Sequence, residues 1–388
     1  MKSGWNSGLR ARGFWARLIS AILLLAGTTA AGQSWKWTIE QVDASGNTSA
    51  IFLTTDPEGD VHASYANDQE GIMYAFRPAG ASRWFTMPVE KIGYATFTRV
   101  AVDSKENPHI CYTAAGKMKY AALIDSNWQI QQINPGSGTI AYSCSVGVAP
   151  DGTPQVTWYQ ERTANDLNYL HFKYAILQDG RWLAKTIDFD AQTGKWHQML
   201  LDSAGHPHIA YDAFVKGEMR YAYSEGNTWK ISRVDSRELG NGKNWNVGMG
   251  NSLALDDHGN AYITYYHSDG LYYARQTGTS WSIVKVDDVA PLGGWLGYRS
   301  SLVLNSRGFP RISYEDAGLL KFAFWDGTKW NTQVLVGAMA GSPFLFSSMT
   351  IDSAGTVYVG YRDPADGSLK VAVGVQMTVP LSASSKKP

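Results

Sequence analysis

Seven copies of one sequence pattern follow one another along the chain at intervals of 46 to 54 residues. The clearest copies read LDSAGHPHIAY at residues 201–211, LNSRGFPRISY at 304–314 and VDSKENPHICY at 102–112. In each copy, one position three residues before a Tyr or Trp marks the register; the seven marks are His62, His109, Gln155, His208, Tyr262, Arg311 and Tyr358. A period near 50 residues with strand-like content is typical of the blades of a β-propeller.

Each copy predicts four short strands separated by polar or glycine-bearing turns, as in segments 252–256, 261–266, 271–274 and 281–286 of the fifth copy. The last copy has only three such segments, and the missing one is found near the other end of the chain. Residues 35–43 (WKWTIEQVD) match the fourth segment of the fourth copy, 229–235 (WKISRVD). The sequence therefore predicts an all-β fold: a seven-bladed β-propeller of four-stranded antiparallel blades, with the last blade closed by the N-terminal strand.

The two ends of the chain differ from the repeats. Residues 1–32 combine four basic side chains, no acidic one, a short apolar run and small residues, which predicts a secretory signal peptide. No cysteine lies near the expected cleavage point and no other long apolar run follows, so we expect a secreted or periplasmic protein with no lipid anchor and no membrane insertion. We expect residues 33–378 to form a single propeller domain and residues 379–388 to form a disordered tail.

Charge and cysteine content exclude several classes of function. Without the four basic residues of the predicted signal, acidic side chains outnumber basic ones by about four, so nucleic-acid binding has no electrostatic support. Cys111 and Cys144 are the two cysteines, too few for an all-cysteine zinc site. Either a single disulfide or two buried thiols fits the sequence, because the distance between them is not encoded in their spacing.

Comparison between the copies separates scaffold positions from candidate functional ones. The acidic turn residues recur in nearly every copy, which is typical of side chains that bind local backbone N–H groups. His62, His109 and His208 occupy one equivalent position in three blades, so they are expected to pack between blades and not to converge on a metal ion. We expect neither a metal nor another cofactor.

The repeats, with their Gly-x-x-His-Ile-x-Tyr-like pattern, resemble those of secreted bacterial seven-bladed propellers of the sialidase-like superfamily with BNR-type repeats. The resemblance covers nearly all of residues 35–375. Because that superfamily includes polysaccharide lyases, glycosidases and sugar-binding proteins, the resemblance implies a glycan as the partner of this chain. It does not select one activity.

The predicted start of each first strand gives a ring of candidate site residues at the mouth of the central channel. The seven positions are Ile51, Thr98, Cys144, His197, Asn251, Ser300 and Ser347. His197 is the one imidazole among them and the candidate acid or base. Arg99 and Arg299 are expected to hold a carboxylate or sulfate, and Tyr298 is the fourth candidate catalytic residue.

Loops of variable length on the same face supply candidate substrate-binding residues. Aromatic side chains offer flat faces to sugar rings, and polar residues at strand ends offer hydrogen bonds. The candidates are Trp196, Trp245, Asn251, Trp295, Asp212, Asp316 and Arg362.

Three functions fit these residues. The first is recognition of a glycan or polysaccharide by a monomer, through a central funnel on the face that carries the long inter-blade loops. The second is a polysaccharide lyase or glycoside hydrolase that acts in the same funnel. The third is a docking scaffold for another protein.

Overall fold

The computed structural model describes residues 33–93, 95–133, 139–164, 167–190, 192–226, 228–236, 247–267, 269–289, 299–337 and 347–378. The predicted signal segment 1–32 and the predicted tail 379–388 lie outside these residues. Within the described part of the chain, no helix is long and apolar enough to cross a membrane.

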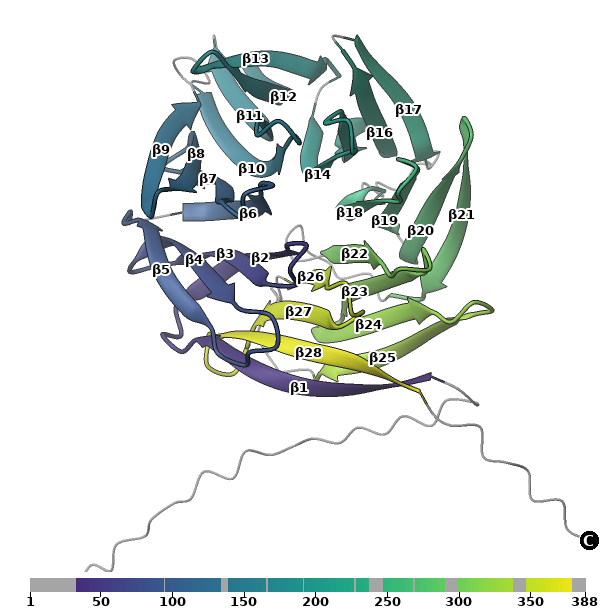
Figure 1. Cartoon of the computed structure of the whole chain (residues 1–388). Helices are drawn as coiled ribbons and strands as arrows, with labels where there is room; N and C mark the ends of the chain where they lie inside the picture. The colour runs from purple at the N-terminus through teal and green to yellow at the C-terminus, as the bar shows by residue number, and fades with distance from the viewer. Residues whose placement is uncertain are drawn as a thin grey trace, which may run out of the picture.

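Seven four-stranded antiparallel sheets stand around a central axis (Figure 1). Blade 1 contains β2 (Thr48–Thr55), β3 (Val61–Asn67), β4 (Gly71–Arg77) and β5 (Phe85–Glu90); blade 2 contains β6 (Ala95–Val102), β7 (Pro108–Ala114), β8 (Lys117–Ile124) and β9 (Asn127–Ile133). Blade 3 contains β10 (Thr139–Val148), β11 (Pro154–Ala164), β12 (Leu167–Gln178) and β13 (Arg181–Asp188); blade 4 contains β14 (Thr193–Leu201), β15 (Pro207–Ala213), β16 (Glu218–Glu225) and β17 (Thr228–Ser236); blade 5 contains β18 (Met249–Leu255), β19 (Ala261–His267), β20 (Gly270–Thr277) and β21 (Ser280–Asp287). Blade 6 contains β22 (Ser300–Leu304), β23 (Pro310–Asp316), β24 (Leu319–Trp325) and β25 (Trp330–Val336); blade 7 contains β26 (Ser347–Ile351), β27 (Val357–Arg362), β28 (Leu369–Thr378) and β1 (Gln33–Asp43). The predicted fold class is confirmed.

Blade 7 is completed by the N-terminal strand. β1 pairs antiparallel with β28 from Gln33 opposite Thr378 to Asp43 opposite Leu369, and the two strands run side by side at the rim of the ring (Figure 1). The prediction that the last blade borrows its outer strand is therefore confirmed. This pairing covers the edge of β28, which a three-stranded blade would leave with unpaired backbone groups.

The burial of each strand follows its distance from the axis. Second strands such as β3, β7 and β15 are buried at every position, whereas fourth strands such as β9 and β17 alternate between exposed and partly buried side chains. This is expected when sheets pack face to face and only their outer strands meet water. The described buried apolar residues form seven clusters, and each cluster joins the facing sheets of two neighbouring blades.

A recurring aromatic contact ties each of blades 1 to 6 to the following blade. The tryptophan that begins a fourth strand packs edge-on against an aromatic ring in the third strand of the preceding blade. The pairs, with centroid separations of 5.0 to 5.7 Å, are Tyr74–Trp128, Tyr120–Trp182, Tyr174–Trp229, Tyr221–Trp281, Tyr273–Trp330 and Phe322–Trp35. The fourth-strand tryptophans thus belong to the scaffold.

The three equivalent histidines take part in a chain of hydrogen bonds within their blades. The ring of His62 joins the turn carboxylate of Asp56, 3.0 Å away, to the hydroxyl of Tyr74. The same arrangement links Asp103, His109 and Tyr120 in blade 2 and Asp202, His208 and Tyr221 in blade 4. The Asp-His-Tyr chain uses both ring nitrogens of each histidine in holding a turn, so these imidazoles are structural groups.

Candidate functional site

The structure brings the predicted ring of seven together at the channel mouth. The side chains of Ile51, Thr98, Cys144, His197, Asn251, Ser300 and Ser347 line one pocket, together with residues next to them in sequence. The pocket is small, with a volume of about 30 Å³, which is more than the roughly 10 to 15 Å³ that one water molecule needs on this measure. A small anionic group fits this space.

Two guanidinium groups, from Arg99 on β6 and Arg299 just before β22, lie in the wall of this pocket. Arg99 lies over the ring of Phe52 at 4.5 Å, and its Nη2 donates to the carbonyl of His197 at 3.2 Å. Arg299 lies 5.4 Å from the ring of Trp196. Burial, together with the positive charge of Arg299, lowers the pKa of Arg99 to about 9, and burial lowers that of Arg299 to about 10. Both shifts follow from the cost of burying a positive charge.

His197 is a buried part of the pocket wall, with 3% of its surface exposed. Its Nδ1 donates to the carbonyl of Gly194 at 2.9 Å, and its ring packs against that of Phe172. Burial, with Arg99 as the next cause, lowers the pKa of His197 to about 3. At neutral pH the imidazole is therefore uncharged, and as a base it is far weaker than an ordinary histidine.

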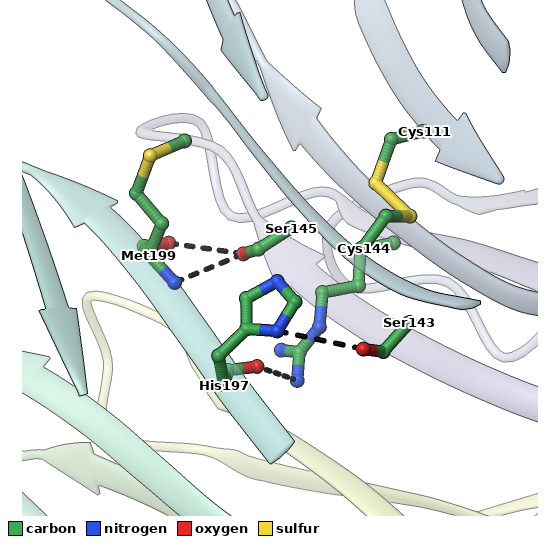
Figure 2. Close-up of a disulfide and its surroundings, with 7 residues drawn as sticks. Cys111, Ser143, Cys144, Ser145, His197 and Met199 are labelled. Carbon is green, nitrogen blue, oxygen red and sulfur yellow. Dashed lines mark hydrogen bonds between the residues drawn. A yellow bond between two sulfur atoms is a disulfide. The ribbon is translucent and has the colours of Figure 1, made fainter. Parts of the chain in front are cut away.

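Hydrogen bonds between neighbouring first strands hold the channel wall rigid. Ser145 on β10 accepts from the backbone N–H of Met199 and donates to its carbonyl, while His197 lies beside Ser143 and the Cys111–Cys144 disulfide (Figure 2). The disulfide joins β7 of blade 2 to β10 of blade 3, with 6.2 Å between the two Cα atoms. Of the two states that the sequence left open for these cysteines, the structure has the disulfide.

Trp196 and Asn251 also line the channel mouth. The Asn251 amide donates to the carbonyls of Trp196 and Gly248, at 2.9 and 2.8 Å, so it fixes the segment that carries Trp196. Asp316 and Arg362 do not line this pocket; Asp316 instead pairs with Lys321 at 3.1 Å. The remaining candidates, Trp245, Trp295 and Tyr298, lie outside the described residues.

Asp212 lies behind the pocket wall, fully buried. Its Oδ1 accepts the backbone N–H of Trp196 at 2.8 Å, while Oδ2 has no hydrogen-bond partner in the part of the chain that the structure describes. Burial raises its pKa to about 7. The carboxyl thus titrates near neutrality and positions Trp196 through the backbone.

Asp212 is expected to make the protein less stable as pH rises from about 4 to 7. In that range the folded carboxyl retains a proton that the unfolded chain releases, so ionisation favours unfolding by roughly 1.4 kcal/mol for each pH unit. The free energy of unfolding of the Asp212→Asn variant should lack this decrease with pH. Relative to the wild type it should therefore rise by up to about 4 kcal/mol between pH 4 and pH 8. Urea unfolding at both pH values measures the difference; parallel pH profiles would contradict the assignment.

Several residues of the pocket were not among the sequence candidates, namely Phe52, Phe97 and Lys195. Phe52 and Phe97 stand next to ring positions, and their adjacency was the available signal. No Asp or Glu lines the pocket among the described residues, so its charged groups are all basic. The described residues also contain no cluster of three or more His, Cys, Asp or Glu side chains arranged to hold a metal ion.

No protein-family profile matches the chain, and no curated protein is similar to it in sequence. Its fold is similar to that of the fucose-specific lectin from Aleuria aurantia, with 13% identity and a TM-score of 0.52 over 78% of this chain and 100% of the lectin. The polysaccharide lyase Uly1 has 11% identity and a TM-score of 0.53, over 84% of this chain and 89% of the lyase. The SapL1 lectin, solved with α-methyl fucoside, has 12% identity and a TM-score of 0.53, over 77% and 100%.

The chain is therefore a seven-bladed β-propeller. Its structural neighbours include fucose lectins and a polysaccharide lyase. At these identities the likeness concerns the fold, and the ligand must be argued from the residues of this chain.

Proposed function

We propose that this protein is a secreted, monomeric glycan-binding propeller whose ligand carries acidic groups, and that it binds them at the mouth of the central channel. The observation that carries the proposal is the convergence of two buried guanidinium groups, those of Arg99 and Arg299, in the wall of one pocket. A carboxylate or sulfate bound there is held through charge-assisted hydrogen bonds.

The size of the pocket suggests how such a glycan binds. A volume of about 30 Å³ admits an acidic substituent beside Arg99 and Arg299. The aromatic residues that line the pocket, Phe52, Phe97 and Trp196, provide contacts for the sugar, in the manner of aromatic side chains that stack on apolar sugar faces.

The same residues favour binding over lyase chemistry. A lyase needs a cation to neutralise the uronate carboxylate, which Arg99 and Arg299 supply, and also a base near the proton that is removed. His197 has its pKa lowered to about 3 and is buried, which makes it a poor base at neutral pH. Polysaccharide lyase or glycoside hydrolase activity in the same funnel remains the alternative, and the assay below separates it from binding.

Replacing the two arginines should abolish acidic-glycan binding. Loss of one charge-assisted bidentate contact costs about 1.5 to 3 kcal/mol, so Arg99→Gln or Arg299→Gln alone should weaken binding about 10- to 100-fold. Each substitution also removes a buried positive charge, so the melting temperature should not fall. Isothermal titration of the mature protein with polyuronates, sulfated polysaccharides and neutral polysaccharides provides the measurement, and Arg181→Gln, an exposed residue on β13, is the matched control.

The titrated samples are also followed for absorbance of unsaturated uronate and for reducing ends. Binding that is lost in the arginine variants, with neither product, supports the proposal. New absorbance indicates a lyase, and reducing ends without absorbance indicate a hydrolase. Binding of no polysaccharide would contradict the proposal and favour protein docking.

The disulfide supports the proposed export, as does the composition of the N-terminal segment. A buried disulfide between two blades persists in an oxidising environment, such as the periplasm or the exterior of the cell. This agrees with export directed by residues 1–32.

A further inference from the structure

A second and much larger hollow lies on the opposite face of the ring, where the turns between first and second strands emerge. It spans blades 5, 6 and 7 and has a volume of about 1240 Å³. Its wall includes the aromatic rings of Trp35, Trp325, Trp330 and Phe309, together with Arg311. The size suits a saccharide of several rings, and the aromatic surfaces are of the kind that pack on sugars.

Blade 6 departs from the pattern of blades 1, 2, 4, 5 and 7 in the wall of this hollow. In blades 1, 2 and 4 the register position is a histidine that joins a turn Asp to a third-strand Tyr, and in blades 5 and 7 it is a tyrosine whose hydroxyl donates to the turn Asp. Blade 6 has Arg311 at this position, Asn305 at the turn and Phe322 in the third strand. Asn305 replaces the turn carboxylate by an amide, and Phe322 lacks the hydroxyl of the third-strand tyrosine. Arg311 adds a permanent positive charge between them, so the hydrogen-bonded chain of the other blades is absent from blade 6.

Arg311 is left with an incomplete set of acceptors. The residue has 1% of its surface exposed, and its Nη1 donates to the carbonyls of Pro310 and Trp325 at 3.0 and 2.9 Å. Its Nε has no hydrogen-bond partner among the described residues. The guanidinium lies 5.6 Å from the rings of both Trp35 and Phe324 and forms no ion pair with a carboxylate among the described residues. Burial, with the charge of Arg307 next, lowers its pKa to about 10.

Two of the three carboxylates that line the hollow, Asp256 and Asp352, are engaged within their own blades, whereas the third, Asp257, is exposed. Asp256 accepts from Asn260 and Tyr262, and Asp352 accepts from Thr356 and Tyr358, each within its own blade. Asp326 accepts from Thr328 and Asn331 next to its own turn. A buried cation without its own counter-ion costs several kcal/mol, and an external anion offsets that cost.

We propose that this hollow is a second ligand site, distinct from the channel mouth, that binds an acidic saccharide with its carboxylate or sulfate on Arg311. The aromatic wall holds the sugar rings, and Arg307 and Arg275 at the exposed rim add positive charge. The site does not depend on the function proposed for the channel, since the two pockets lie on opposite faces and share no residue.

The decisive variant is Asn305→Asp, which restores to blade 6 the turn carboxylate of five other blades. Asn305 Oδ1 accepts the backbone N–H groups of Arg307 and Phe309, and an aspartate oxygen accepts the same bonds. The new carboxylate should pair internally with Arg311, raise the melting temperature and weaken anion binding at least tenfold. Arg311→Gln should weaken binding equally without supplying that pair.

The measurement is isothermal titration of glucuronate, a glucuronate-containing disaccharide, glucose and inorganic sulfate into the Arg99→Gln/Arg299→Gln protein, in which the channel site is removed. Disaccharide binding that is lost in Asn305→Asp and absent for glucose supports the site. If sulfate binds as tightly as the disaccharide, the aromatic wall adds no affinity for the sugar rings. That result overturns the proposed saccharide ligand and indicates a site for free anions. Absence of binding, or binding unchanged by Asn305→Asp, overturns the proposal. These titrations do not depend on whether the channel mouth binds a glycan, because they use protein in which Arg99 and Arg299 are replaced. An incorrect proposal for the channel would therefore leave their results unchanged.

Discussion

A chain that lacks β1 is expected to lose the folded ring, and a synthetic peptide of residues 33–43 to restore it. β1 covers the whole edge of β28, and Trp35 and Trp37 pack at 5.0 and 5.1 Å from the ring of Phe322 in blade 6. Removing a packed tryptophan costs about 3 to 5 kcal/mol, so losing both and the strand pairing is comparable to the whole stability of a typical domain, about 5 to 15 kcal/mol. Near-ultraviolet circular dichroism and thermal unfolding, with and without the peptide, measure the effect.

Point variants on the same strand make this prediction quantitative. Trp37→Ala should cost about 3 kcal/mol, because the indole packs directly on the backbone of Gly374. Ile39→Ala is the matched control, since Ile39 is 53% exposed, and its effect should stay below about 0.5 kcal/mol. A truncated chain that melts cooperatively at the wild-type temperature would show that closure by β1 is dispensable.

Removing the Cys111–Cys144 disulfide should destabilise the protein by about 4 kcal/mol. The bond closes a loop across 33 residues of sequence separation, and the entropy that it removes from the unfolded chain is worth about 4 kcal/mol at this length. The Cys111→Ala/Cys144→Ala variant should therefore unfold at a lower urea concentration than the oxidised wild type. Both cysteines are buried, so dithiothreitol should reach the bond only when the chain opens.

Two comparisons separate the covalent bond from the packing of its sulfur atoms. Wild type unfolded and refolded in dithiothreitol keeps both side chains and loses only the bond, so it should resemble the double variant to within about 1 kcal/mol. The double variant itself should not respond to dithiothreitol. Equal urea midpoints for oxidised and reduced wild type would contradict the prediction.

The fold was predictable because repetition makes each blade evidence for the others. The position of a turn in one copy gives its position in all, so the seven residues of the channel mouth follow from counting along the first strands. The pairing of β1 with β28 was equally readable, because residues 35–43 carry the tryptophan pattern that the last copy lacks. These features depend on local periodicity, which a single sequence contains.

The chemistry of individual groups was less predictable because it depends on burial. His197 was expected to titrate as an ordinary imidazole, but its depth between Phe172 and the arginines lowers its pKa to about 3. Asp212 was expected to contact substrate, and the structure places it behind Trp196. The disulfide depends on the distance between neighbouring blades, which spacing along the chain does not give.

Arg311 illustrates a signal that was present and not interpreted. Arg311 marks the register of the sixth repeat. Because the histidines at equivalent positions in other repeats are structural, the sequence pattern indicates a structural role for Arg311 as well. The departure becomes meaningful when Asn305 and Phe322 are considered with it, because three linked substitutions in one copy remove every partner of the equivalent group. The connection of Phe322 to Arg311 depends on the register between the second and third strands of blade 6, which the structure supplies.

The pairing of Gln33 with Thr378 has a practical consequence for any experiment that attaches the protein to a support. Both residues stand at the end of blade 7 that borders the hollow lined by Trp35, Gln376 and Met377. A tag, a dye or a surface linker joined before residue 33 or after residue 378 therefore starts beside that hollow and on the face away from the channel mouth. Immobilisation through either end presents the channel mouth to the solution, whereas assays of Arg311 require label-free protein or attachment through an exposed side chain of another blade.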